Sequence, residues 1–154
     1  MKYDTTRFGH IEVTTKDVLN FPVGLYGFER ENAFTCLPFA PNVESPMEWL
    51  QSLQTPQLAF VITDPFLYVP DYSVKLTEGE KTEIGYEPGH TLETRVIVTI
   101  PENYLEMTAN LVAPLVINLT SGQARQFVLT SMEYDTRHFL LPEEARAGKV
   151  EVTD

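Results

Sequence analysis

The run from Met107 to Asn118, MTANLVAPLVIN, constrains the fold most strongly. Its apolar and β-branched residues are typical of a buried strand. Pro114 has no N–H to donate, so a helix is disfavoured and a strand has to bulge or lie at an edge there. The run contains no residue type that commonly performs catalysis. It therefore carries information about the fold rather than about an active site.

Two other runs have the same strand-like character, Trp49 to Phe60 and Thr94 to Ile100. Short β-rich runs alternate with turns that contain Pro, Gly and Asn, and no long segment has helical periodicity. The sequence therefore predicts an all-β fold, a small antiparallel and partly closed β-barrel-like single domain over residues 1–141.

At most one short helix is expected, over residues 77–85. Thr77 is suited to cap it, and Glu80 three residues later would complete a capping box. Residues 142–154 are charged and rich in small side chains, which indicates a C-terminal tail or short helix. Trp49, the only tryptophan, is expected to pack in the core against Phe60 and Leu115.

The composition suits one compact domain, with 43% hydrophobic residues among 154. Cys36 is the only cysteine, which rules out an intrachain disulfide. The first residues lack the apolar core of a signal peptide, and no run approaches the roughly 20 apolar residues that span a bilayer. These features predict a cytoplasmic protein with no membrane partner.

The net charge is −11, from 11 basic and 22 acidic residues. Long-range repulsion disfavours direct binding to nucleic acid or to an anionic membrane, whereas a basic protein is a suitable partner. The same charge could equally serve solubility alone.

The histidines, His10, His90 and His138, are far apart in sequence and match no metal-binding spacing. Cys36 lies in an apolar run without a basic neighbour, which indicates an inert buried thiol. Gly24 and Gly27 lack the spacing of a phosphate loop. We therefore expect no metal and no cofactor.

Two hypotheses of other classes remain open. An enzyme would need Asp64, Asp71, Arg137 and His138 to converge in one pocket. Asp64 and Asp71 lie beside prolines, however, and are more typical of turns. A small-molecule-binding barrel would need a sizeable apolar cavity, and an interior filled with side chains would count against it.

The stretch DPFLYVPD supplies the best binding signal, because its large apolar side chains cannot all face one side of a thin β domain. Exposed aromatic residues bracketed by acids are suited to anchoring a protein partner, although core packing is an equal alternative. The candidate partner-binding residues are Phe66, Leu67, Tyr68, Asp71, Tyr72, Glu78, Glu80 and Glu83.

Several motifs together resemble one family, the bacterial flagellar assembly factor FliW. They are FPVGLYGFE (21–29), WLQSL (49–53), LAFVITDPFLYVPDY (58–72), MTANLVAPLVIN (107–118), and Tyr134 with TRH (136–138). The resemblance covers roughly residues 1–141, and the motifs follow the family's order.

This resemblance implies a β-barrel-like domain that works by binding proteins and not by catalysis. Such proteins bind the translational regulator CsrA, a basic RNA-binding dimer, and prevent it from repressing flagellin mRNA. They also bind flagellin, which occupies the factor until secretion removes it. The expected partners are therefore CsrA and flagellin.

Overall fold

The computed structural model describes residues 1–40, 42–131 and 133–146. The strands are β1 (Lys2–Thr5), β2 (Gly9–Glu12), β3 (Leu19–Asn20), β4 (Ala33–Ala40), β5 (Val43–Ser52), β6 (Ala59–Thr63), β7 (Leu92–Thr99), β8 (Thr108–Ala109), β9 (Leu115–Asn118), β10 (Gln123–Gln126) and β11 (His138–Phe139). The helical elements are the 3-10 turns η1 (Thr15–Asp17), η2 (Pro65–Leu67) and η3 (Tyr104–Glu106) and the α-helix α1 (Glu78–Glu83).

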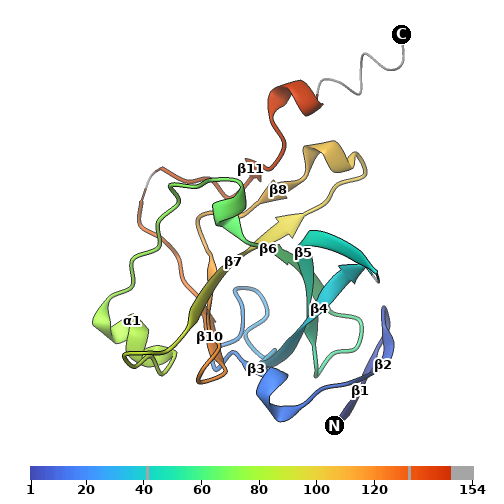
Figure 1. The fold of residues 1–154 in the computed structure, drawn as a ribbon, viewed down its shortest axis with the longest axis vertical. Helices are drawn as coiled ribbons and strands as arrows, with labels where there is room; N and C mark the ends of the chain where they lie inside the picture. The colour runs from blue at the N-terminus through green and yellow to red at the C-terminus, as the bar shows by residue number, and fades with distance from the viewer. Residues whose placement is uncertain (41, 132, 147–154) are drawn as a thin grey trace.

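Most of the strands form one sheet that closes on itself (Figure 1). Its order is β11-β8-β7-β6-β5-β4-β3-β10-β9, and β9 also pairs with β7, which completes a ring. The ring is weakest between β10 and β3, a parallel contact with a single paired position, Gln123 with Asn20. The other ladders of this sheet are antiparallel. The predicted all-β, partly closed barrel is confirmed.

Strand β7 contains an uninterrupted apolar run, Val96 to Val98, and the structure shows why. Ile97 faces the interior of the ring, where it packs on a cluster that includes Leu50, Ile62 and Leu115. Its neighbours Val96 and Val98 point to the other face and are also buried. A strand covered on both faces loses the usual alternation of apolar and polar residues.

The outer face is covered by two long connections, one after β6 and one after β10. Tyr72 from the first connection is buried against Met47, Val98 and Leu111, and Leu129 and Tyr134 from the second connection pack on the same cluster. The barrel therefore has an inner core and an outer core, and the outer core holds both connections in place.

The expected place of Trp49 in the inner core is wrong. In antiparallel β5, Leu50 pairs with Phe60 and points inward, so the adjacent Trp49 points outward. Its ring stacks on Phe39 at 5.5 Å and lies under the β1–β2 turn, where the Arg7 guanidinium is 4.2 Å from the ring centroid.

The Met107–Asn118 run is not one strand. It forms β8 and β9, separated by a turn in which Asn110 Oδ1 accepts hydrogen bonds from the N–H groups of Val112 and Ala113. β9 begins at Leu115, directly after Pro114, so the proline precedes the ladder instead of interrupting it.

The predicted helix is confirmed. Thr77 Oγ1 accepts from Glu80 N–H, and the Glu80 carboxylate accepts from Thr77 N–H, which makes a complete capping box. Residues 143–146 are also helical, within the C-terminal segment for which a tail or short helix was predicted, and residues 147–154 lie outside the described part. Among the helices described, none has the length and apolar character needed to cross a bilayer.

Candidate protein-binding surface

The segment after β6 begins with a short turn that leaves two apolar side chains exposed. Asp64 caps η2 by accepting a hydrogen bond from Phe66 N–H at 2.9 Å, and Pro65 is buried at the first position of the turn. Phe66 and Leu67 remain 41% and 61% exposed. The cap and the proline fix this turn, so it presents both side chains to solvent in a defined geometry.

Tyr72 has a different role from Phe66 and Leu67, because it is buried. Its hydroxyl donates to Leu111 O at 2.7 Å, and its ring meets the Tyr134 ring edge to face. Burial, reinforced by Tyr134, raises the pKa of the Tyr72 phenol. Tyr72 therefore holds the connection on the outer core and does not present its ring to a partner.

The three acids of α1 already have partners. Glu80 accepts within the capping box, Glu78 pairs with Lys81 at 3.3 Å, and Glu83 pairs with Arg125 at 2.6 Å. Exposed pairs of this kind contribute little stability. Glu78 nevertheless keeps 93% of its side chain exposed, so its charge acts on an approaching protein.

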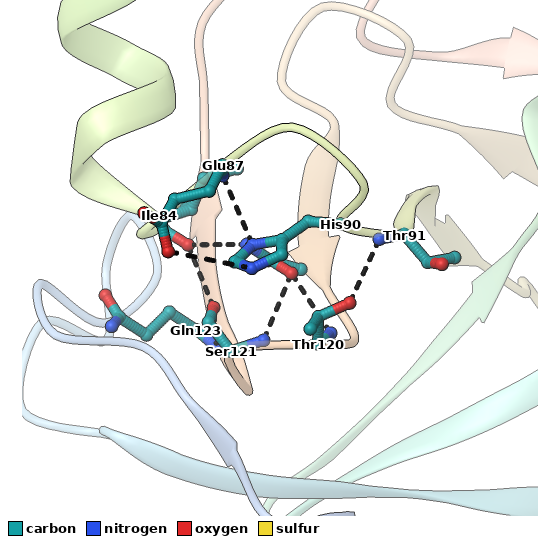
Figure 2. Close-up of polar contacts among 8 residues, drawn as sticks. Ile84, Glu87, His90, Thr91, Thr120, Ser121 and Gln123 are labelled. Atoms are coloured by element: carbon teal, nitrogen blue, oxygen red, sulfur yellow. Dashed lines mark hydrogen bonds and ion pairs between the residues drawn. The ribbon is translucent and has the colours of Figure 1, made fainter.

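A polar network anchors the end of α1 to the turn between β9 and β10 (Figure 2). Buried Asn118 donates to Ile84 O at 3.0 Å, and Ser121 Oγ donates to the same carbonyl at 2.9 Å. His90 Nδ1 is 3.1 Å from Asn118 Nδ2 and accepts from Glu87 N–H at 3.2 Å. With two N–H groups directed at Nδ1, the neutral ring carries its proton on Nε2, toward Glu87. This network fixes the position of α1 relative to the barrel.

A groove of about 460 Å³ separates the connection before α1 from the segment that follows β10. Its lining residues are Asp71, Ser73, Lys75, Leu76, Thr77, Glu80, Phe127, Val128, Leu129, Thr130, Ser131, Glu133 and Tyr134. At one end of the groove the two sides are joined by a hydrogen bond, in which Tyr134 Oη accepts from Ser73 N–H at 3.1 Å. We call this feature the lateral groove.

The structure brings some predicted binding residues together and separates others. Asp71 and Glu80 line the lateral groove, whereas Phe66 and Leu67 lie at η2 and are not part of its lining. Tyr68 is half-buried against the outer core. The predicted surface is therefore an extended flank of the barrel and not one compact patch.

The four residues of the enzyme hypothesis do not converge in the part of the chain that the structure describes. Asp71 lines the lateral groove, whereas Arg137 lines a different groove of about 440 Å³. Asp64 serves as the cap of η2, and His138 pairs with Ala109 in the β11–β8 ladder.

The inner core bears on the small-molecule hypothesis. Side chains including Phe21, Phe34, Leu50 and Ile62 fill the ring and are fully buried. This packing counts against a ligand cavity inside the barrel.

Cys36 packs on the inner core and lies near Glu48, Glu93 and Arg95. Burial, reinforced by Glu48, raises the pKa of the thiol to about 12. A thiol that is protonated at neutral pH is a poor nucleophile, as expected from the sequence. Among the described residues, no group of three or more His, Cys, Asp or Glu side chains is placed to hold a metal ion.

Sequence reasoning missed the second wall of the lateral groove, formed by residues 127–131, 133 and 134. Phe127 and Leu129 are buried or half-buried, whereas Val128 and Thr130 are exposed. This alternation predicts a half-buried strand but gives no sign of what lies beside it. The other missed feature is the second groove, where Tyr26 and Phe28 are 56% and 40% exposed.

Comparison with known proteins gives consistent matches over nearly the whole chain. The family model described as FliW protein matches residues 2–140. The chain is 42% identical to the flagellar assembly factor FliW of Heliobacterium modesticaldum over 145 residues, which cover 94% of each protein. It is 39% identical to that of Alkaliphilus metalliredigens over 143 residues, 93% of this chain and 88% of the relative. A crystal structure of the flagellar assembly factor FliW superimposes with a TM-score of 0.84 at 35% identity, covering 94% of this chain and 99% of the other.

Proposed function

Because this chain belongs to the FliW family of flagellar assembly factors, we propose that it is a non-catalytic binding protein of the cytoplasm that antagonises the translational regulator CsrA and also binds flagellin. The observation that carries the proposal is the family match, which extends from residue 2 to residue 140 and so includes both grooves and α1. The chemistry of the surface is compatible with such partners.

The charge of the chain supports a basic partner. A net charge of −11 attracts a basic protein at long range and raises the rate of encounter. Glu78 and Asp71 lie on the flank that carries the candidate surface, and both are exposed. Their pairing energy at the rim is small, so they contribute more to the association rate than to the final affinity.

Short-range contacts come from the apolar side chains that the fold leaves exposed. The Asp64 cap fixes the backbone that carries Phe66 and Leu67, so little backbone conformational entropy is lost when a partner covers them. Apolar anchors of this kind mainly slow dissociation.

The resemblance to the family supports an indirect mode of inhibition. The protein binds CsrA beside its RNA site and biases it against RNA, without contacting RNA itself. Such a coupling is reciprocal, so bound RNA weakens the binding of this protein by the same factor. Flagellin in the cytoplasm competes for the factor until it is secreted, which couples flagellin level to its translation.

Calorimetric titration of the purified chain into the CsrA of its host, with and without a flagellin leader RNA, tests the proposal. We expect binding to free CsrA and weaker binding when RNA is present. No heat of binding in either titration would refute the CsrA part. A parallel titration with flagellin tests the second partner, and its failure would refute that part alone.

A further inference from the structure

The second wall of the lateral groove follows β10, which ends at Gln126, and its backbone keeps a strand-like pattern of hydrogen bonds. The N–H groups of Phe127 and Leu129 donate to Pro114 O at 3.0 Å and Val112 O at 2.7 Å. Alternate residues of a strand direct their backbone groups to opposite sides, so those of Val128 and Thr130 point away from residues 112–114. Within the described residues, neither N–H has a hydrogen-bond partner.

The facing wall also lacks backbone-to-backbone pairing over most of its length within the described residues. Residues 73–77 have no regular secondary structure, and the N–H groups of Val74, Lys75 and Leu76 have no hydrogen-bond partner among residues 1–40, 42–131 and 133–146. The wall is nevertheless held at both ends, by the contact of Ser73 with Tyr134 and by the capping box that begins at Thr77.

The two walls run along the same side of the barrel (Figure 1). They do not pair with each other over the described residues, and the groove of about 460 Å³ lies between them. A bare strand edge of this kind is a template for another strand. An incoming extended segment would satisfy backbone donors and acceptors that a helix, whose own groups are already paired, would leave unsatisfied.

The side chains of the groove indicate the composition of such a segment. Its apolar lining includes Phe127, Leu129 and Leu76, which suit the apolar side chains of alternate residues. Among its charged lining residues, Asp71, Glu80 and Glu133 outnumber Lys75. The lining therefore complements a segment in which apolar residues alternate with Lys or Arg.

We propose that the lateral groove binds an extended, basic segment of a protein partner, which adds as a strand to the Val128–Thr130 edge. The expectation that the partner is basic rests on the proposed function, which this inference deepens by naming the site and the form of the ligand. The strand-edge geometry, however, is tested with peptides alone.

The probe is a capped eight-residue peptide that alternates valine and lysine, with a valine–glutamate peptide of the same length as its counterpart. Backbone amide signals of the isotope-labelled protein are followed by NMR during titration. We expect the valine–lysine peptide to shift the amide signals of Val128 and Thr130 and to slow their hydrogen exchange, because both amides become donors. We expect no such change with the valine–glutamate peptide.

A matched pair of variants separates the backbone from the side chain. Val128→Pro removes an N–H that has no partner among the described residues, whereas Val128→Ala keeps the N–H and removes most of the side chain. We expect Val128→Pro to weaken peptide binding about tenfold or more, and Val128→Ala to change it by less than about threefold. Thermal unfolding of both variants shows whether the barrel is intact.

Three results would overturn the proposal: no shift at Val128 and Thr130 up to about 1 mM valine–lysine peptide, equal binding of the two peptides, or unchanged binding by a folded Val128→Pro. If Val128→Pro does not fold, the exchange rates of the unmodified protein decide alone. Calorimetry with CsrA is independent of these measurements, so failure of the proposed function and failure of the groove assignment give different results.

Discussion

The rings of Tyr72 and Tyr134 meet edge to face, with centroids 4.7 Å apart and planes at 65°. Tyr72 belongs to the connection before α1 and Tyr134 to the connection after β10, so this contact joins the two walls of the lateral groove at one end. The Tyr134 hydroxyl strengthens the link by accepting from Ser73 N–H. The shape of the groove therefore depends on a pair of residues far apart in sequence.

Tyr72→Phe should lower the free energy of unfolding by about 1–3 kcal/mol, because it leaves the buried Leu111 carbonyl without its donor. Tyr134→Phe is the matched control: it also removes one hydroxyl, but the Ser73 N–H it leaves is exposed to water and the cost should be smaller. Urea unfolding of both variants measures the difference. Equal costs would contradict the role assigned to the Tyr72 hydroxyl.

Alkaline pH should destabilise the protein through Cys36. The thiol has a pKa of about 12 in the folded state and 9.0 when unperturbed. Between these values the unfolded state loses the proton and the folded state keeps it. The contribution of the thiol to the free energy of unfolding is therefore fully present below pH 9 and is lost as the pH rises toward 12.

Cys36→Ala should remove this contribution, which amounts to about 1.4 kcal/mol for each pH unit within that range. Denaturant unfolding at pH 8, 9 and 10 compares the variant with the unmodified protein. Tyr72 also lowers the free energy of unfolding as the pH rises above about 10, because burial raises the pKa of its phenol in the folded state. Parallel pH profiles for the two proteins would show that the thiol is not protected in the fold.

Trp49→Ala should cost about 1–3 kcal/mol, the sum of its contacts with Phe39, Phe8 and Arg7. Leu50→Ala, one residue further along β5, should cost about 2–5 kcal/mol because it leaves a cavity inside the ring. Hydrogen exchange adds a positional test, since only Trp49→Ala should loosen the β1–β2 hairpin. If both variants loosened the ring equally, the outward orientation of Trp49 would be contradicted.

Asn118→Ala should loosen α1 from the barrel, because the Asn118 side chain joins Ile84, His90 and the turn at Thr120. We expect faster hydrogen exchange over residues 84–90 and a loss of about 2–4 kcal/mol, since several buried groups lose partners. Thr120→Ala, which removes a single acceptor for Thr91 N–H, is the control and should leave α1 protected.

Neutralising acids near α1 should slow the encounter with CsrA more than neutralising acids elsewhere. Glu78→Gln with Glu87→Gln changes the net charge as much as Glu12→Gln with Glu44→Gln, and all four residues are exposed. Strands β2 and β5, which contain Glu12 and Glu44, lie across the barrel from α1 (Figure 1).

Stopped-flow kinetics at two salt concentrations measures the effect. We expect the first pair to lower the association rate at low salt and to leave the dissociation rate nearly unchanged, with the difference shrinking as salt screens the charges. Equal rates for the two double variants would place the binding face away from α1.

The sequence by itself determined the features whose causes are local. The capping box depends on Thr77 and Glu80 within one turn of helix, and the Asp64 cap depends on the two residues that follow it. The strand runs were recognisable because Val, Ile and Leu recur between Pro, Gly and Asn turns. The same motifs, in their order, were sufficient to indicate the family that the comparisons confirmed.

Only the tertiary structure decided which face of each strand lies inside. Trp49 and Leu50 are both large and apolar, and since the outward face of β5 is covered by the β1–β2 turn, composition could not separate them. The ring closes through the β7–β9 ladder. One end of the lateral groove is closed by the hydrogen bond between Ser73 and Tyr134, which are 61 positions apart in the chain. Such contacts depend on how both connections pack on the outer core, and no local pattern of residues encodes that packing.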